Sequence, residues 1–325
     1  MTDVALLRRI VSAAAAVARD PAIVAPLAAS TGLSPEGVRL ALAEHLELDV
    51  TDAELEKLVY DARPVARVHV ILSANVFVAP LRALVLARAA SARFTVRPSR
   101  REPVFAHALV DTLADAGVTI EDRSVAAISE GEIHVYGRDA TIADVTKQAR
   151  VPVVGHGAGM GVAFVPASAD LEALALALAR DVVPFDQRGC LSPRVAFVEE
   201  GSRAFAKLLS RALDRASESV PRGMLFEDER AEATRYADTL AFAGVLERGA
   251  SSLVGHAETL LVPPPGRHVH VMPWNEAALA SIGRFVVTVG SLTEDDARRI
   301  APAHARAAVL GEMQRPRLDG PVDRR

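Results

Sequence analysis

Residues 171–198 read LEALALALARDVVPFDQRGCLSPRVAFV, and this segment has the pattern that decides the fold. Residues 171–181 are rich in regularly spaced apolar side chains, which predicts a helix, and the short apolar run at 195–198 predicts a buried strand. A polar loop that contains a Gly-Cys pair joins the two. The segment is therefore one helix–loop–strand unit.

The same alternation extends in both directions from this segment. Strands alternating with helices at this spacing predict an α/β fold with a mainly parallel sheet. Further strands are expected at 68–72, 94–97, 133–136, 151–154, 161–165, 260–262, 269–272 and 285–289, and further helices at 80–90, 103–116, 141–147, 202–216 and 228–243.

Residues 1–60 have a different texture and are expected to be helical. Apolar residues between positions 6 and 17 share one helix face. Ser34 precedes Pro35 as an N-cap followed by proline at the first helical position. Thr51 and Glu54 have the spacing of a capping box.

The composition excludes several classes of protein. With 50% hydrophobic and 24% charged residues, the 325-residue chain is too apolar for a disordered protein. A formal net charge of −4 leaves no global basic field for nucleic acid. The single cysteine excludes an internal disulfide and a thiolate-rich metal centre. Without a convincing export signal or a run of ~18 uncharged apolar residues, we expect no membrane span and a cytoplasmic location.

Two further motifs fit binding sites poorly. The glycine cluster at 155–161 lacks the G-x-G-x-x-G register of a dinucleotide loop. His268 and His270 alternate along a predicted strand, and without a third ligand nearby we expect an exposed strand face rather than a metal site.

Residues 27–38 have the spacing of a helix-turn-helix. The second helix carries Glu36 and Glu44 against Arg39 alone, whereas binding to phosphates needs cations there. We therefore expect a helical hairpin that packs on the main domain rather than a DNA-binding element.

Cys190 is the candidate nucleophile. A lone cysteine is commonly a small buried hydrophobic residue. This one follows a glycine in a polar loop, where reactive groups can be presented. Arg188 nearby would favour the thiolate, and a backbone N–H in such a loop can point at a developing oxyanion.

The loop 186–193 with the strand 195–199 resembles the catalytic-cysteine loop of the acyl-CoA reductases of the bacterial bioluminescence type (LuxC-like), in the aldehyde dehydrogenase superfamily. Other segments resemble that family in the same order along the chain, and this order is more specific than any one of them. They are the asparagine strand end 73–76 with the helix 81–90, the cofactor-side segments 94–99 and 103–106, the diphosphate turn 135–142, the Gly-His pair at 155–157, and the tail from 310–314 through Asp319 and Gly320.

The resemblance implies a fold and a reaction. It implies an aldehyde dehydrogenase-like α/β fold with a helical segment at 1–60, a Rossmann-like nucleotide-binding domain at 61–182, and a catalytic cysteine domain with a C-terminal tail at 183–325. Cys190 would attack the carbonyl of an acyl thioester, while Asn75 and the Cys190 backbone N–H hold the oxyanion. Coenzyme A would leave as a thiolate, and a nicotinamide would reduce the acyl group to an aldehyde.

The resemblance also implies a set of cofactor contacts. Arg97 stands where the superfamily has lysine, and a guanidinium can clamp a 2′-phosphate bidentately, so we expect NADPH and leave NADH open. The alternatives are that Arg97 is an exposed strand-end cation, Asn75 a turn-capping amide and Gly137 an ordinary turn. The implied cofactor-binding residues are Arg97, Pro98, Ser99, Gly137, Arg138, Thr141, Gly155 and His156.

Residues 154–157 contain no carboxylate, although hydrolytic aldehyde dehydrogenases have a water-activating glutamate there. Its loss disfavours hydrolysis of the acyl-enzyme and suits reduction of acyl-CoA or an acyl-carrier protein. His156 can replace that base or line the nicotinamide pocket. An acyl-phosphate or semialdehyde-type reductase and an inactive interaction subunit stay open as alternatives. The chain is shorter than usual superfamily members, so we expect reduced oligomerisation arms and leave a homo-oligomer open.

Overall fold

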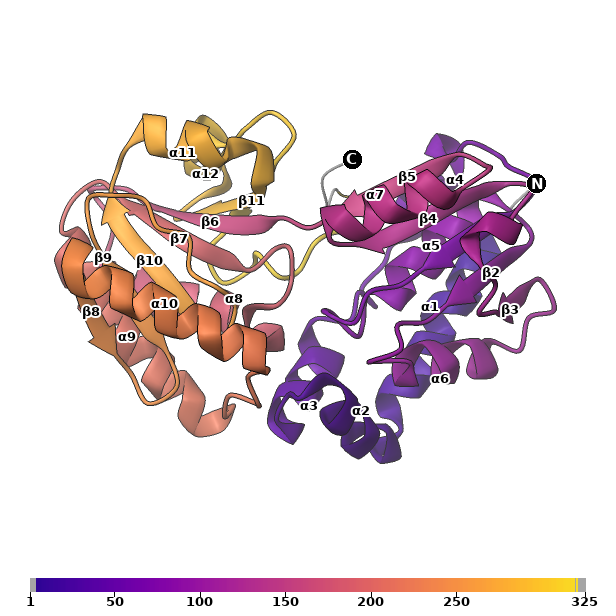
Figure 1. The fold of residues 1–325 in the computed structure, drawn as a ribbon, viewed down its shortest axis with the longest axis horizontal. Coiled ribbons are helices and arrows are strands. Elements are labelled where there is room, and N and C mark those ends of the chain that lie inside the picture. The colour runs from indigo at the N-terminus through magenta and orange to yellow at the C-terminus, as the bar shows by residue number, and fades with distance from the viewer. Residues whose placement is uncertain (1–3, 319, 321–325) are drawn as a thin grey trace. The chain divides into compact units, whose positions relative to one another are not determined.

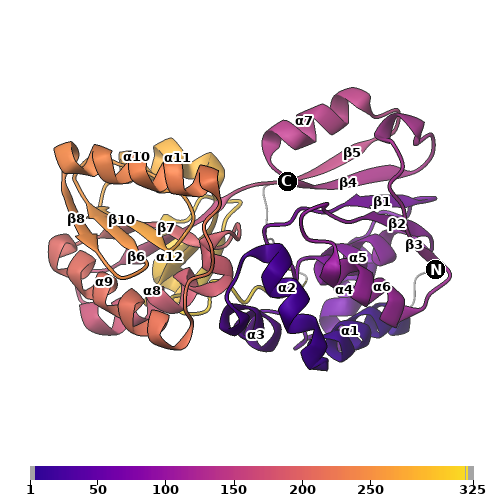
Figure 2. The ribbon, with the colours of Figure 1, turned by 60° about the horizontal axis from the view of Figure 1, so that its bottom comes forward.

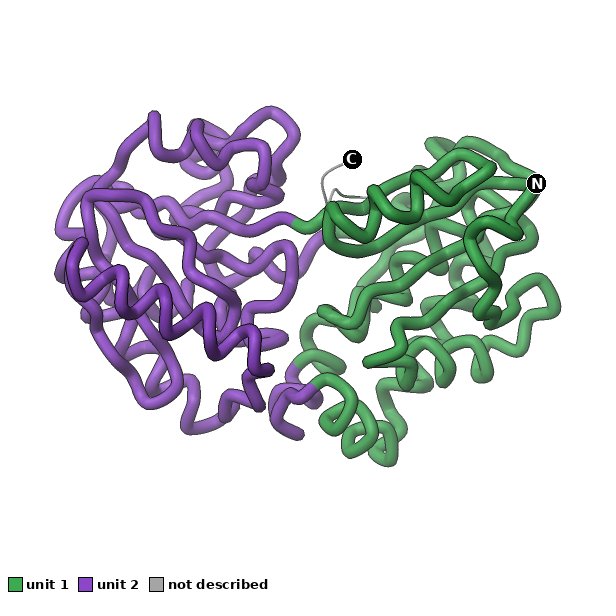
Figure 3. Tube along the Cα trace, viewed as in Figure 1, with its two compact units in different colours: residues 1–31, 41–158, 317–325 green, residues 32–40, 159–316 purple. Residues whose placement is uncertain are grey.

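The computed structural model describes residues 4–318 and 320, which form two compact units (Figure 1). Unit 1 comprises residues 1–31, 41–158 and 317–325 as far as they are described, and unit 2 comprises residues 32–40 and 159–316 (Figure 3). Asp319, which belongs to the tail resemblance, lies outside the described residues.

Unit 1 contains a five-stranded parallel sheet in the order β3-β2-β1-β4-β5. Helices α5 (Pro80–Ala90) and α6 (Val104–Leu113) lie on one side of this sheet, and α7 (Asp139–Gln148) lies on the other side (Figure 2). The strand order reverses between β1 and β4, which is where open α/β sheets bind ligands at the carboxyl ends of their strands. The strands are β1 (Val68–Ile71), β2 (Phe94–Arg97), β3 (Val118–Ile120), β4 (Glu132–Gly137) and β5 (Val153–Gly157).

The N-terminal segment is helical, as the sequence predicts. Helix α1 buries one apolar face and packs on α5 and α6. The capping box forms: Thr51 N donates to Glu54 Oε2 at 2.8 Å, and Glu54 N donates to Thr51 Oγ1 at 3.2 Å. The expected N-cap also forms, because Gly37 N donates to Ser34 Oγ at 3.0 Å. The helices are α1 (Val4–Arg19), η1 (Pro21–Ile23), α2 (Val24–Thr31), α3 (Pro35–Glu44) and α4 (Asp52–Asp61).

Unit 2 contains a seven-stranded sheet in the order β12-β11-β6-β7-β10-β9-β8, in which the pairing of β8 with β9 is antiparallel. Helices α8 and α9 cover one face with apolar side chains, and α10, α11 and α12 cover the other (Figures 1 and 2). The strands are β6 (Met160–Val165), β7 (Pro193–Val198), β8 (Val245–Arg248), β9 (Leu253–His256), β10 (His268–Pro273), β11 (Val286–Ser291) and β12 (Arg306–Val309), and the helices are α8 (Leu171–Val182), α9 (Ser202–Ser219), α10 (Glu227–Ala243), α11 (Glu276–Ile282) and α12 (Glu294–Ile300).

The division into units differs from the boundary expected after residue 182. Strand β6 lies between β11 and β7 in the second sheet, and α8 packs on that sheet, so unit 2 resumes at Gly159. Residues 32–40 of the helical hairpin also belong to unit 2, where Leu40 packs against the core on the α8–α9 side.

Two local predictions are wrong. Residues 260–262 are not a strand. This part of the sheet is formed instead by β9, which pairs with β10, and by β8, which pairs with β9. The sequence does not predict β9 because this strand contains Gly255, which interrupts the apolar pattern typical of a strand. Glycine is required there, since an added Cβ would lie 2.3 Å from the Tyr236 hydroxyl.

The expected exposed face of β10 is buried. His268 and His270 are 1% and 0% exposed, because β10 lies between β7 and β9 and helices cover both faces of the sheet. Burial lowers the pKa of each imidazole to about 4, so both rings are neutral at pH 7. Among the described residues, no three or more His, Cys, Asp or Glu side chains are placed to hold a metal ion.

No single described helix is long and apolar enough to cross a membrane. By length and composition only, α1 and the segment Pro21–Thr31 meet that criterion as a pair, and this pair is bent by 74°.

Candidate active site

Cys190 lies in unit 2, in the loop between α8 and β7, and its side chain is partly exposed. The turn η3 (Pro184–Gln187) precedes it. Phe185, Asp186 and Gln187 have φ angles of 55°, 48° and 66°, so three consecutive residues other than glycine are left-handed. This conformation costs about 1–2 kcal/mol per residue, and side-chain interactions must hold it.

The Asp186 carboxylate makes the central interaction of this turn. Arg267 Nε donates to Asp186 Oδ1 at 2.9 Å, its Nη2 lies 2.8 Å from the same oxygen in the ion pair, and Gly223 N donates to Oδ2 at 2.9 Å. Both charged side chains are 1% exposed. Arg267 also donates from Nη1 to the carbonyl oxygen of Val220 at 2.7 Å, so the pair ties the turn to the segment after α9.

Gln187 links the turn to two strands. Its Nε2 donates to the carbonyl oxygens of Pro193 at 2.6 Å and His268 at 2.7 Å, and its Oε1 accepts from His268 N at 2.8 Å. The side chain is completely buried. Gln187 therefore joins the first residues of β7 and β10 directly beside the cysteine loop.

Arg188 forms an ion pair with Glu229. It donates from Nε and Nη2 to the two carboxylate oxygens of Glu229 at 2.7 and 2.9 Å. Burial opposes ionisation of Glu229, but its hydrogen bonds with Arg188 and the Arg188 charge lower its pKa. This pairing speaks against the expectation that Arg188 is the cation that favours the Cys190 thiolate. Arg194, at the start of β7, interacts electrostatically with Cys190.

The C-terminal segment supports the other side of the loop. Asp181 is buried at the end of α8 and accepts hydrogen bonds from Gly311 N and from Met313 N, the latter at 2.9 Å. Gln314 Nε2 donates to Ser192 Oγ at 2.6 Å, two residues after the cysteine. Burial raises the pKa of Asp181 to about 7.

Gly161 lets β6 approach the cysteine loop. An added Cβ would lie 2.5 Å from the carbonyl oxygen of Leu191 and 2.9 Å from Pro193 N. Gly161 N donates to the carbonyl oxygen of Ser192 at 2.8 Å. This member of the glycine cluster therefore serves close packing against the candidate nucleophile's loop.

The candidate residues of unit 1 gather at the carboxyl edge of its sheet. Asn75 is exposed in the segment after β1, and its Oδ1 accepts from Arg101 Nη2 at 3.3 Å. Arg97 ends β2 and Gly137 ends β4, so these three residues follow or end neighbouring strands. Pro98 and Ser99 continue from Arg97, and Arg138 and Thr141 lie at the start of α7.

The other two implied cofactor residues, Gly155 and His156, lie on β5. An added Cβ at Gly155 would lie 2.7 Å from Ile142 Cγ2, so this glycine holds α7 close to the sheet. The His156 ring is 4% exposed and stacks on Tyr136 with a centroid distance of 4.0 Å and an interplanar angle of 3°. His156 is thus packed inside unit 1, which fits a positioning role better than proton transfer.

The chemistry of this edge fits a nicotinamide dinucleotide. The short β4–α7 turn directs the first amide groups of a ten-residue helix toward the strand ends, and such a terminus favours phosphate oxygens. Among the residues that the structure describes, Arg97 has one long hydrogen bond, 3.4 Å from Nη1 to the carbonyl oxygen of Arg123, which leaves its other donors for a ligand. Residues of the described chain can therefore hold both phosphate and ribose groups.

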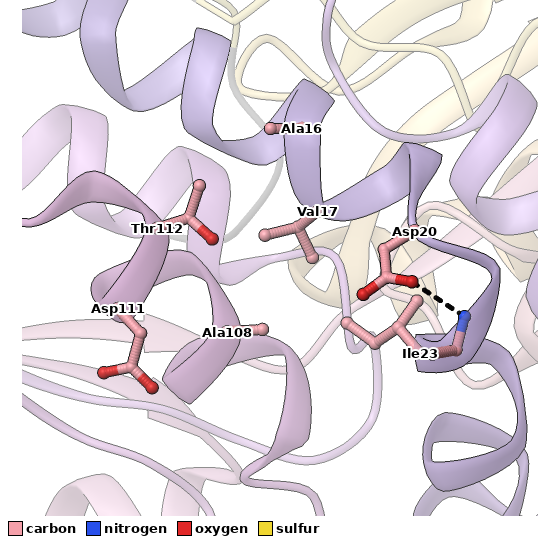
Figure 4. Close-up of a pocket in the computed structure, with 8 residues that line it drawn as sticks. Ala16, Val17, Asp20, Ile23, Ala108, Asp111 and Thr112 are labelled. Carbon is pink, nitrogen blue, oxygen red and sulfur yellow. Dashed lines mark hydrogen bonds between the residues drawn. The ribbon is translucent and has the colours of Figure 1, made fainter.

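A separate pocket in unit 1 contains none of the candidate residues. It lies between the end of α1 and α6 and is lined by Val17, Ile23, Ala108 and neighbouring residues (Figure 4). Its Asp20 carboxylate accepts from Ala22 N at 2.9 Å and caps η1.

A comparison with known protein families matches residues 38–282 to the family described as acyl-CoA reductase (LuxC). The chain belongs to this acyl-CoA reductase family. The match spans both the sheet edge that carries Asn75 and Gly137 and the loop of Cys190. A search of curated protein sequences found no match.

Solved structures show that the fold is that of aldehyde dehydrogenases. An NAD-dependent aldehyde dehydrogenase from Sinorhizobium meliloti has a TM-score of 0.74 at 15% identity, over 99% of this chain and 76% of that one. An NAD-dependent benzaldehyde dehydrogenase from Corynebacterium glutamicum has a TM-score of 0.72 at 16% identity, over 92% and 78%. A proline utilization A variant from Bradyrhizobium japonicum has a TM-score of 0.70 at 14% identity, and this chain spans 38% of its length.

Replacing the central carboxylate of the turn tests its structural role. Asp186→Asn leaves Arg267 as an unpaired buried cation, so the free energy of unfolding should fall by about 3–5 kcal/mol. The matched control is Asp52→Asn, which removes the exposed partner of Arg8 and should cost at most about 1 kcal/mol. Urea denaturation of both variants measures the difference, and equal losses would contradict this account of the turn.

Asp181 should impose a pH dependence on stability. Its pKa is about 7 in the folded chain against 3.8 as the ordinary value, so its contribution is complete below pH 3.8 and is lost as the pH rises to about 7. Asp181→Asn removes this titration. We expect the unfolding free energy of the unmodified chain, minus that of the variant, to fall between pH 5 and 7 and to be constant above pH 8. A difference that does not change with pH would refute the prediction.

Proposed function

We propose that this chain reduces an acyl thioester to an aldehyde, with Cys190 as the nucleophile and NADPH as the reductant. The observation that carries the proposal is the Cys190 loop, because a strained turn, a buried ion pair and three distant segments hold this one cysteine at the surface of unit 2 in a member of the acyl-CoA reductase family. The proposed donors are acyl-CoA and acyl-carrier protein, and the proposed location is the cytoplasm.

The first half-reaction is acyl transfer to Cys190. The thiolate attacks the thioester carbonyl, and the negative charge moves to the carbonyl oxygen. By the family resemblance, the Asn75 side-chain amide and the Cys190 backbone N–H would donate hydrogen bonds to this oxygen. The bond from carbon to the carrier sulfur then breaks, and the carrier leaves as a thiolate. The charge of Arg194 favours the thiolate form of Cys190 at the start of this step.

The second half-reaction releases the aldehyde from Cys190. The chemistry that a bound nicotinamide would supply here is the two-electron reduction of the acyl group on Cys190. Asn75 again stabilises the oxygen anion on the carbon attached to Cys190, and this carbon–sulfur bond breaks to give aldehyde and the free thiolate. Residues 154–157 offer no carboxylate to activate water, so the acyl-enzyme is protected from hydrolysis.

The cofactor would lie at the carboxyl edge of the unit 1 sheet. Gly137, Arg138 and Thr141 would hold the diphosphate at the start of α7. Arg97, with Pro98 and Ser99, would hold the adenosine ribose, and the guanidinium would pair with the 2′-phosphate of NADPH. Gly155 and His156 support this edge by fixing α7 and the face of β5 behind it.

Two substitutions test the cysteine chemistry. Cys190→Ser should abolish acyl-enzyme formation and turnover, and Asn75→Ala should lower kcat by roughly 10²–10³, the cost of one oxyanion donor. Loss of nicotinamide absorbance with acyl-CoA donors of several chain lengths measures turnover, and mass spectrometry measures the acyl group on Cys190. Free thiol released from the donor distinguishes thioester from acyl-phosphate reduction. Turnover by Cys190→Ser, or its absence with every donor in a folded wild-type protein, would overturn the proposal.

The choice of reductant depends on Arg97. Arg97→Gln should weaken NADPH binding roughly ten- to hundredfold and leave NADH binding unchanged, because only NADPH carries the phosphate that pairs with a guanidinium. Arg93→Gln, an exposed arginine just before the same strand, is the matched control. Fluorescence titration with both nucleotides gives the affinities, and an equal loss for both would exclude a 2′-phosphate contact.

A further inference from the structure

Unit 2 contains a pocket beside the cysteine loop, and the proposed reaction uses only the charge of its Arg194 and assigns no ligand to the cavity itself. Its volume is about 320 Å³, and it lies between α10 and the segment that leads into β10. Arg194 is the lining residue that comes from the strand directly after the cysteine loop. The other lining residues are Glu232, Arg235, Tyr236, Thr239, Leu261, Val262, Pro263 and Pro264.

The Arg194 guanidinium is poorly satisfied. Its Nε is buried and has no hydrogen-bond acceptor among the residues that the structure describes. Within the described chain its one hydrogen bond is long, 3.4 Å from Nη1 to the carbonyl oxygen of Pro263. Glu232, the carboxylate of the pocket, has its Oε1 3.9 Å from Arg235 Nη2. Glu232 and Glu229 interact electrostatically with Arg194, but neither forms an ion pair with it within the described chain. A buried N–H donor left without an acceptor is costly unless a ligand supplies one.

The position of Arg194 restricts which ligand group can reach it. Three residues lie between it and Cys190, and the two side chains are close enough for their charges to interact. A group bound to Arg194 is therefore near the reacting carbonyl. The phosphates of coenzyme A or of a carrier protein are separated from the thioester sulfur by the whole pantetheine arm. The acceptor must then belong to the acyl part of the donor.

The remaining lining suits a short carbon chain that ends in an anion. Leu261, Val262, Pro263 and Pro264 present apolar surface, whereas Arg194 presents unused N–H donors. A carboxylate is planar and can take two of these donors at once. An uncharged chain of the same length would fill the apolar part of the pocket and leave the guanidinium unsatisfied.

We propose that this pocket binds a carboxylate at the far end of the acyl chain, so that the preferred donors are short ω-carboxyacyl thioesters. This inference rests on the proposed function, because it assigns the substrate class of the same cysteine. Arg194 is then the residue that determines specificity.

Binding to an inert variant tests the inference without requiring turnover. In Cys190→Ser protein, calorimetric titration should give succinyl-CoA or glutaryl-CoA an affinity roughly ten- to hundredfold higher than butyryl-CoA or pentanoyl-CoA. Adding Arg194→Gln should remove this preference and leave the affinity for the neutral thioesters unchanged. Arg230→Gln, on α10 outside the pocket lining, should retain the preference and is the control.

Several results would overturn the assignment. Equal affinities for the charged and neutral thioesters in Cys190→Ser would do so, and this comparison does not depend on whether the Arg194 variant folds. Retention of the preference in Arg194→Gln would also do so. Tight binding of acetyl phosphate that requires Arg194, without any preference for ω-carboxyacyl thioesters, would assign the pocket to a phosphate instead.

The two proposals fail in different ways. If wild-type Cys190 is acylated equally fast by succinyl-CoA and butyryl-CoA, the carboxylate inference is wrong and the reductase proposal stands. If Cys190 accepts no acyl group but the variant still prefers the carboxylated thioesters, the pocket assignment stands and the reductase proposal is wrong. Mass spectrometry of the acylated protein separates these results.

Discussion

The buried ion pair between Asp186 and Arg267 is the interaction on which the cysteine loop depends. Three consecutive left-handed residues are not stable by themselves, because each has a conformation of lower free energy available in the unfolded chain. The carboxylate fixes the turn from inside, and the guanidinium passes this constraint to the backbone after α9. Since neither group reaches water, each one needs the other, and the turn is formed only when distant parts of unit 2 are assembled.

This dependence explains why several elements of unit 2 contact the loop that contains Cys190. Gln187 joins β7 to β10, Arg188 reaches α10 through Glu229, and Gln314 reaches Ser192 from the far end of the unit. For the proposed nucleophile, Cys190, support from several elements would fix the direction of approach to a planar carbonyl. The C-terminal segment is thus part of the loop's framework, although it is remote in sequence.

The sequence predicts local features well and long-range features poorly. The alternation of strands and helices, the capping box of Thr51 and the position of the cysteine loop all depend on neighbouring residues, and they were predictable. The partnership of Asp186 with Arg267 was not, because 81 residues separate them and either charge alone resembles a surface residue. For the same reason the sequence places β6 in the first domain, whereas the structure places it in unit 2, since strand order within a sheet is a property of the assembled fold.

Two arginines near Cys190 differ in their hydrogen-bond acceptors, and this difference decides which of them can act on the cysteine or on a ligand. Arg188 is closer in sequence and carries the same group as Arg194, so sequence alone favours it as the cation that acts on the cysteine. In the fold, both carboxylate oxygens of Glu229 accept hydrogen bonds from Arg188. The charge of Arg188 is therefore paired, and the ion pair connects α10 to the loop. Arg194 has only a long bond to a carbonyl oxygen within the described chain, so its field and its donors remain directed at the pocket beside Cys190. Among the described residues, Arg194 has fewer acceptors than Arg188 and is therefore the arginine better suited to bind a substrate group.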